Sequence, residues 1–152
     1  FSGVKRRFSI LNKSSKSMII DDYAHHPSEI KTTLESLKKI TRNKVVAIFE
    51  PHRYTRINSL LKEFIESFSK ADFVFILPIY SAGEKNIKKI TNLHLEKIFK
   101  KKFKNNKIIK AVEKEQNLFK DLKDLYKDEN NIIFLGAGLS TNIAQKFSIY
   151  IE

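Results

Sequence analysis

Hydrophobic positions along the chain fall into two kinds of segment that alternate. Short runs rich in β-branched and aromatic residues are separated by longer stretches in which apolar residues recur every three or four positions. The first kind is typical of buried strands and the second of amphipathic helices, so the alternation indicates a parallel sheet with helices on both faces. The predicted strands are 17–21, 44–49, 73–79, 107–112 and 131–136, and the predicted helices are 27–40, 59–70, 91–101, 115–127 and 140–151.

The segment before the first of these strands adds an edge to the sheet. RRFSIL (6–11) alternates in polarity and is joined to residues 17–21 by the polar stretch NKSSK, which predicts a hairpin-like antiparallel edge strand. A chain of 152 residues is long enough for one domain with a substantial core. We therefore expect a single Rossmann-like, three-layer α/β domain whose sheet has about six strands, mostly parallel with one antiparallel edge strand.

Several predicted helices begin with residues suited to a first turn. Pro27 and Glu29 fit the start of the first helix, and His26 immediately before them can act as its cap. Thr91 and Ser140 are placed to cap two later helices through their hydroxyl oxygens.

The composition limits the class of protein. There is no cysteine, so neither a disulfide framework nor a thiolate metal site is available. No segment approaches the roughly 20 apolar residues that span a bilayer, and the opening FSGVKRRF lacks the apolar region of a signal peptide. We expect a soluble, cytoplasmic protein that does not contact a membrane.

The net charge of +12 raises the alternative of a non-catalytic, basic α/β module that binds nucleic acid or another polyanion. Lysines recur through nearly every predicted helix instead of forming one stripe, and basic and aromatic residues interleave only in KIFKKKFKNNK at 97–107. Such dispersion is more typical of solvated helix faces than of a binding groove. Nucleic acid is therefore the less favoured partner.

Polar or glycine-rich segments follow four of the predicted strands. They are DDYAHHP (21–27), EPHRYTR (50–56), YSAGE (80–84) and GAG (136–138). The carboxyl ends of parallel strands meet at one edge of a sheet, and ligands bind there in open α/β folds. We expect the chemistry of this protein at that edge.

The segment EPHRYTR indicates an anion site. His52, Arg53 and Arg56 come just after a strand, and two guanidinium groups so close in sequence can bind one carboxylate or phosphate. The alternative is that both arginines are solvated loop residues. The acidic and histidine-rich loop expected at the same edge favours the anion site.

The segment DDYAHHP allows several interpretations. Asp21, Asp22, His25 and His26 could be metal ligands, but adjacent histidines on a tight turn point apart and no further ligand spacing stands out. No nucleophile elbow accompanies them, so nucleophilic catalysis is not indicated. Contacts to a substrate or nucleotide are the favoured function, and the competing structural role is capping of the next helix by the histidines.

The glycine segment GAGLS (136–140) is a weak signal. GxGxxG is incomplete because Thr141 stands where the third glycine would fall, so packing of a strand against a helix is the favoured role. The phosphate-binding pattern GxxxxGK(S/T) is absent. If this chain handles ATP, another domain must hold most of the nucleotide.

Taken together, five segments resemble the C-terminal domain of the Mur ligases, and in particular of those that act on UDP-N-acetylmuramate and L-alanine. The segments are FSGVKRRF (1–8), DDYAHHPSEI (21–30), FEPHRYTR (49–56), IYSAGE (79–84) and GAG (136–138). The resemblance covers essentially the whole chain in the right order. It implies that residues 1–152 form one such domain, and that the N-terminal UDP-binding and central ATPase domains are absent from this chain.

The resemblance implies an ATP-dependent, amide-forming ligase of peptidoglycan synthesis. ATP would convert the muramoyl carboxylate into an acyl phosphate, which the amino group of L-alanine attacks, with Mg²⁺ held mainly by the missing central domain. The partners implied are ATP, L-alanine, UDP-N-acetylmuramate and the other two domains. The domain alone would be inactive, and it would contain no catalytic or metal-binding residue of its own.

The resemblance also implies roles for individual residues. Arg7, or less favourably Arg6, would reach the ATP phosphates, and Asp22, or less favourably Asp21, the ribose. The amino-acid end of the site would contain Tyr23, His25, His52, Arg53 and Arg56, the two arginines holding the alanine carboxylate. The chain departs from the family at Ser9, Glu50, Leu139 and Ser140: an acid usually follows the last glycine motif, and glutamine is common at position 50.

Overall fold

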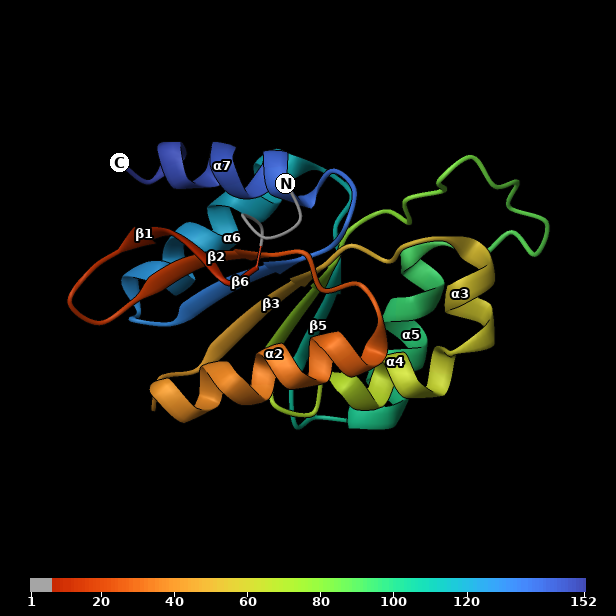
Figure 1. Ribbon diagram of the computed structural model, residues 1–152, viewed down its shortest axis with the longest axis horizontal. Coiled ribbons are helices and arrows are strands. Elements are labelled where there is room, and N and C mark those ends of the chain that lie inside the picture. The colour runs from red at the N-terminus through yellow and green to blue at the C-terminus, as the bar shows by residue number, and fades with distance from the viewer. Residues whose placement is uncertain (1–6) are drawn as a thin grey trace.

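The computed structural model describes residues 7–152, so Arg6 and the residues before it lie outside the described part. A six-stranded sheet has the order β1-β2-β6-β3-β4-β5, with β1 antiparallel to β2 and every other pair parallel (Figure 1). This confirms the predicted fold class and the antiparallel edge strand. The strands are β1 (Ser9–Lys13), β2 (Met18–Asp22), β3 (Val45–Phe49), β4 (Phe73–Ile76), β5 (Ile108–Ala111) and β6 (Asn131–Leu135).

Helices cover both faces of the sheet and bury a core on each side. Successive residues of β3 point to opposite faces, so Phe49 packs with Phe64 and Phe68 on one side, whereas Ile48 packs with Phe147 on the other. The first face carries α2 (Pro27–Ile40), α4 (Leu61–Ser67) and α5 (Asn92–Phe103), and the second carries α6 (Glu115–Lys127) and α7 (Ser140–Tyr150). A short helix, α3 (Tyr54–Ser59), precedes α4.

The strand order brings three strand ends together. The chain moves outward from β3 to β4 and β5, and β6 then returns to lie between β2 and β3. At their carboxyl ends the Gly136 N–H donates to the carbonyl of Asp22 at 3.2 Å, and the Glu50 N–H donates to the carbonyl of Leu135 at 2.9 Å. The loops after β2, β6 and β3 therefore start side by side. A long loop between β4 and α5 protrudes beside α3 (Figure 1).

Two helix starts differ from the prediction. The predicted helix 59–70 is the shorter α4, and the helix α3, which was not predicted, precedes it with a bend at Leu60. Arg56 therefore lies within α3 and not in a loop. Ser140 does not cap α7: the helix begins at Ser140 itself, after Leu139, and the buried Ser140 hydroxyl has no hydrogen-bond partner among the described residues. Thr91 caps α5 as predicted, since its hydroxyl accepts from the His94 N–H at 3.4 Å.

The start of α2 confirms the capping role of His26. Its Nδ1 accepts from the Ser28 N–H at 3.3 Å, and Glu29 Oε1 accepts from the His26 N–H at 3.1 Å.

His26→Ala should therefore lower the free energy of unfolding by about 1 kcal/mol, measured by urea denaturation. His26→Asn keeps a capping acceptor and should retain most of the stability, so an equal loss in both variants would contradict the capping role.

Within residues 7–152, no helix has the length and apolar character required to cross a bilayer.

Candidate functional site

A row of four aromatic rings crosses the carboxyl edge of the sheet. Tyr23 and His25 lie in the loop after β2, His52 after β3 and Tyr80 after β4. The ring centroids are 5.0 Å apart for Tyr23 and His25, 5.4 Å for His25 and His52, and 5.1 Å for His52 and Tyr80. The first two contacts are edge-to-face, and the last is stacked with an interplanar angle of 21°. We call Tyr23, His25, His52 and Tyr80 the ring row; the fold thus brings together three residues predicted for one site.

His52 is held uncharged in this row. Partial burial lowers its pKa below the usual value, and electrostatic interactions with His25, Arg56 and Arg53 lower it further, against a smaller opposing effect of Glu84. Arg56 Nη1 lies 3.5 Å from His52 Nδ1, where a guanidinium can only donate. His52 Nδ1 is therefore the acceptor, and the ring proton lies on Nε2.

The two arginines have different surroundings. Arg53 has the unusual backbone angles φ 60° and ψ 158°, which turn the chain from β3 into α3, and its Nε lies 3.7 Å from Glu84 Oε2. Arg56 is one turn further along, and the contact it makes with His52 is to a neutral ring instead of a carboxylate. The positive charge of Arg56 is therefore less offset than that of Arg53.

Glu84 supports this site although sequence reasoning assigned it no role. Its Oε1 accepts from the Thr55 N–H at 3.1 Å and its Oε2 from the Thr55 hydroxyl at 2.6 Å, and these bonds lower the pKa of Glu84. The carboxylate thus ties the loop after β4 to the first turn of α3, which carries Arg56. The signal available was an acid within the strand-end segment IYSAGE, but its partner is 29 residues away in sequence.

A second group of predicted residues lies beside the start of α2. Asp22 is buried, and its oxygens accept from the Ala24 N–H at 2.8 Å and the Phe8 N–H at 2.7 Å. Asp22, Arg7 and Tyr23 help line a pocket of about 270 Å³. Asp21 points elsewhere, accepting from the Thr141 hydroxyl at 2.9 Å.

The neighbouring histidines separate as expected. The ring of His25 joins the ring row and its Nδ1 donates to the Tyr23 carbonyl at 2.9 Å, whereas the ring of His26 binds Ser28 at the start of α2. Among residues 7–152, no three His, Cys, Asp or Glu side chains gather closely enough to hold a metal ion.

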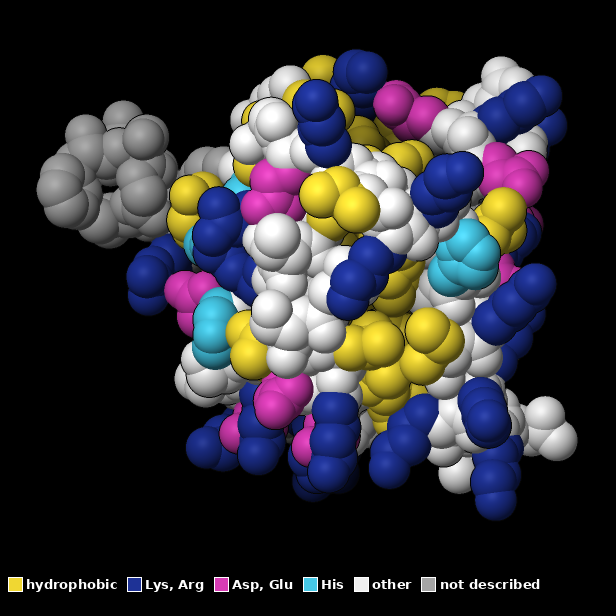
Figure 2. All heavy atoms as spheres, turned by 90° about the vertical axis from the view of Figure 1, so that its right-hand side faces the viewer, with side chains coloured by type: hydrophobic (Ala, Val, Ile, Leu, Met, Phe, Trp, Pro, Cys, Tyr) yellow, Lys and Arg dark blue, Asp and Glu magenta, His cyan; other side chains and the backbone are white. Residues whose placement is uncertain are grey.

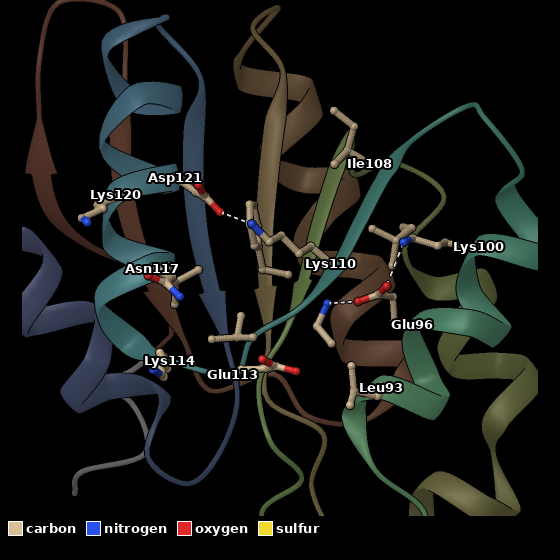
Figure 3. A pocket seen from close by; sticks show the side chains of 15 residues that line it. Leu93, Glu96, Lys100, Ile108, Lys110, Glu113, Lys114, Asn117, Lys120 and Asp121 are labelled. Atoms are coloured by element: carbon tan, nitrogen blue, oxygen red, sulfur yellow. Dashed lines mark hydrogen bonds and ion pairs between the residues drawn. The ribbon is translucent and has the colours of Figure 1, made fainter.

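A larger pocket lies away from the ring row. It follows the free edge of β5 between α5 and α6 and has a volume of about 600 Å³ (Figure 3). Two of its lysines are paired with acids, Lys110 with Asp121 at 2.6 Å and Lys100 with Glu96 at 2.7 Å, and Glu96 also accepts from the Ala111 N–H on the strand edge. Glu96 thereby binds a backbone N–H group that a further strand would need in order to pair with the free edge of β5.

Lys and Arg side chains are spread over the surface. In Figure 2 they occur on all sides of the face shown, interspersed with acidic and hydrophobic side chains. They form no continuous basic stripe on that face, which agrees with the dispersion seen in the sequence.

The fold and the site define an α/β domain that gathers imidazole, phenol and guanidinium groups at the carboxyl edge of a Rossmann-like sheet. The family model described as "Mur ligase, glutamate ligase domain" matches residues 6–138. The chain belongs to this family.

The curated relatives include enzymes named UDP-N-acetylmuramate--L-alanine ligase. That of Fusobacterium nucleatum is 39% identical over an alignment covering 100% of this chain and 33% of the relative. That of Rickettsia felis is 40% identical, over 96% of this chain and 31% of the relative. The chain thus spans about a third of the length of the relatives it matches.

Solved structures agree with the family. The UDP-N-acetylmuramate-alanine ligase of Thermotoga maritima superposes with a TM-score of 0.64 and 28% identity, over 95% of this chain and 29% of that one. A murein peptide ligase of Psychrobacter arcticus shares the fold with a TM-score of 0.75 at 21% identity, over 97% of this chain and 30% of that one.

Proposed function

We propose that this chain is the C-terminal domain of an ATP-dependent ligase that joins L-alanine to UDP-N-acetylmuramate in the cytoplasm. The observation that carries the proposal is the 39% identity, along the whole chain, to a relative with that name. The grouping of Tyr23, His25, His52, Arg53 and Arg56 around the strand ends supplies chemistry suited to an amino acid.

The amino acid would bind at the end of the ring row beside α3. Its carboxylate requires a cation that is not already neutralised, and Arg56 meets this requirement better than Arg53, which lies near Glu84. The α-ammonium group, two bonds away, would then lie near His25 and His52. His52 is uncharged and does not repel that ammonium group.

The nucleotide would lie next to Asp22 and Arg7, which share the 270 Å³ pocket. Asp22 suits the ribose better than Asp21, whose carboxylate faces Thr141; the alternative phosphate contact, Arg6, lies outside the described residues. ATP, when bound, supplies the phosphoryl group that activates the muramoyl carboxylate. The described residues offer no cluster of ligands for Mg²⁺, which we assign to a central domain of the longer chain.

Phosphate release tests the proposal directly. A longer chain that adds the preceding domains of its relatives should release phosphate from ATP only when UDP-N-acetylmuramate and L-alanine are both present. The 152-residue chain should release none, because it lacks a GxxxxGK(S/T) segment. Ligase activity of the 152-residue chain alone, or no dependence of the longer chain on L-alanine, would refute the proposal.

A further inference from the structure

The glycine segment after β6 is filled by a carboxylate of its own chain. Glu50, at the end of β3, is 3% exposed. Its Oε1 accepts from the Gly138 N–H at 2.8 Å and its Oε2 from the Leu139 N–H at 2.9 Å. These N–H groups immediately precede α7, where the helix dipole favours a negative charge.

The two glycines are required by close packing around this carboxylate. A Cβ atom on Gly136 would lie 2.8 Å from the Cβ of Glu50 and 2.7 Å from the Ser140 hydroxyl. A Cβ atom on Gly138 would lie 2.8 Å from Glu50 Oε1 and 2.8 Å from two ring atoms of Tyr80. Gly138 therefore forms the surface against which the Tyr80 ring packs.

Tyr80 connects this packing to the predicted amino-acid site. Its N–H donates to the carbonyl of Pro51 at 2.9 Å, and its ring stacks on His52 at 5.1 Å. His52 in turn accepts from Arg56. A continuous set of contacts thus runs from Glu50 through Gly138, Tyr80 and His52 to Arg56.

We propose that Glu50 and Gly138 are positioning residues that fix Tyr80 and His52, and through them Arg56, and that the glycine segment does not hold a phosphate. The proposal rests on the proposed function for the identity of the amino acid. A phosphate at this segment would have to displace a buried carboxylate from both N–H groups or lie beside it, and two negative charges so close repel each other.

Steady-state kinetics of the longer ligase distinguish a positioning role of the glycine segment from a phosphate-binding role. Gly138→Ala and Glu50→Ala should raise the KM for L-alanine by about 3- to 10-fold, because small displacements of a binding group are costly, and leave the KM for ATP unchanged. Leu139→Ala is the matched control: it keeps both N–H donors and alters a side chain that is 57% exposed, so neither constant should change. A rise in the ATP KM alone would show a phosphate role and overturn the proposal.

A second measurement does not depend on the proposed function. The 152-residue chain has its own core on both faces of the sheet, so the titration of His52 can be followed in it by NMR. Gly138→Ala should push Tyr80 off His52, increase the exposure of the imidazole, and raise its pKa toward the usual value. An unchanged His52 titration in a folded variant would overturn the contact path.

Arg56→Ala distinguishes failure of the inference from failure of the proposed function. If it leaves the L-alanine KM unchanged, the site assignment fails. If it raises that KM while Gly138→Ala and Glu50→Ala do not, only the positioning role fails.

Discussion

Arg56→Ala in the longer ligase is expected to raise the KM for L-alanine by about 10- to 100-fold, because a hydrogen bond between charged groups contributes about 1.5–3 kcal/mol. The KM for ATP should change little, since Arg56 lies at the end of the ring row beside α3 and the nucleotide is proposed beside Asp22. Steady-state kinetics with each substrate varied in turn measures both constants.

Two variants control this experiment. Arg56→Lys keeps the charge but loses the planar pair of donors, so it should recover part of the affinity. Arg42→Ala removes an exposed arginine that precedes β3, at the opposite edge of the sheet, and should have no effect on either constant. Equal increases in both KM values for Arg56→Ala would remove Arg56 from the amino-acid site.

The sheet and most helices could be predicted because burial imposes a period on the sequence. The helix at 27–40 was predicted with its observed bounds, since apolar residues every third or fourth position coincide there with Pro27 and Glu29 in the first turn. The break at Leu60 has no such signal, because apolar spacing continues from α3 into α4. Local signals also misplaced the cap of α7. The two N–H groups that immediately precede the helix are bound by Glu50 from another strand, and no local pattern contains that contact.

The sequence predicts which loops form the site, because these loops all follow strands at the same edge of the sheet. The strand-end rule identified the loops that carry Tyr23, His25 and His52, but not the order of their rings. That order depends on β6 lying between β2 and β3, which is a long-range property of the fold. Tyr80 was not assigned a role because a tyrosine in a loop has many possible contacts, and its stacking on His52 follows from the close approach of Gly138.

Asp22→Ala is expected to lower the free energy of unfolding by about 2–4 kcal/mol, because a buried N–H that loses its acceptor costs about 1–3 kcal/mol and Asp22 serves two. The acceptor is lost for the buried Ala24 N–H and for the partly buried Phe8 N–H. Denaturation of the 152-residue chain by urea measures the effect, and the exposed Asp124 on α6 provides a matched Asp→Ala control that should change stability little.

The same carboxylate links stability to the proposed nucleotide site. By binding the Phe8 N–H, Asp22 holds the chain next to Arg7, so losing the carboxylate would both free that segment and remove the ribose acceptor. Asp22→Asn keeps one acceptor oxygen and should recover about half of the lost stability. If Asp22→Asn is nearly as stable as the parent but the ATP KM of the longer ligase still rises, Asp22 contacts the nucleotide in addition to its structural role. If the ATP KM follows stability alone, its role is to hold the Arg7 segment.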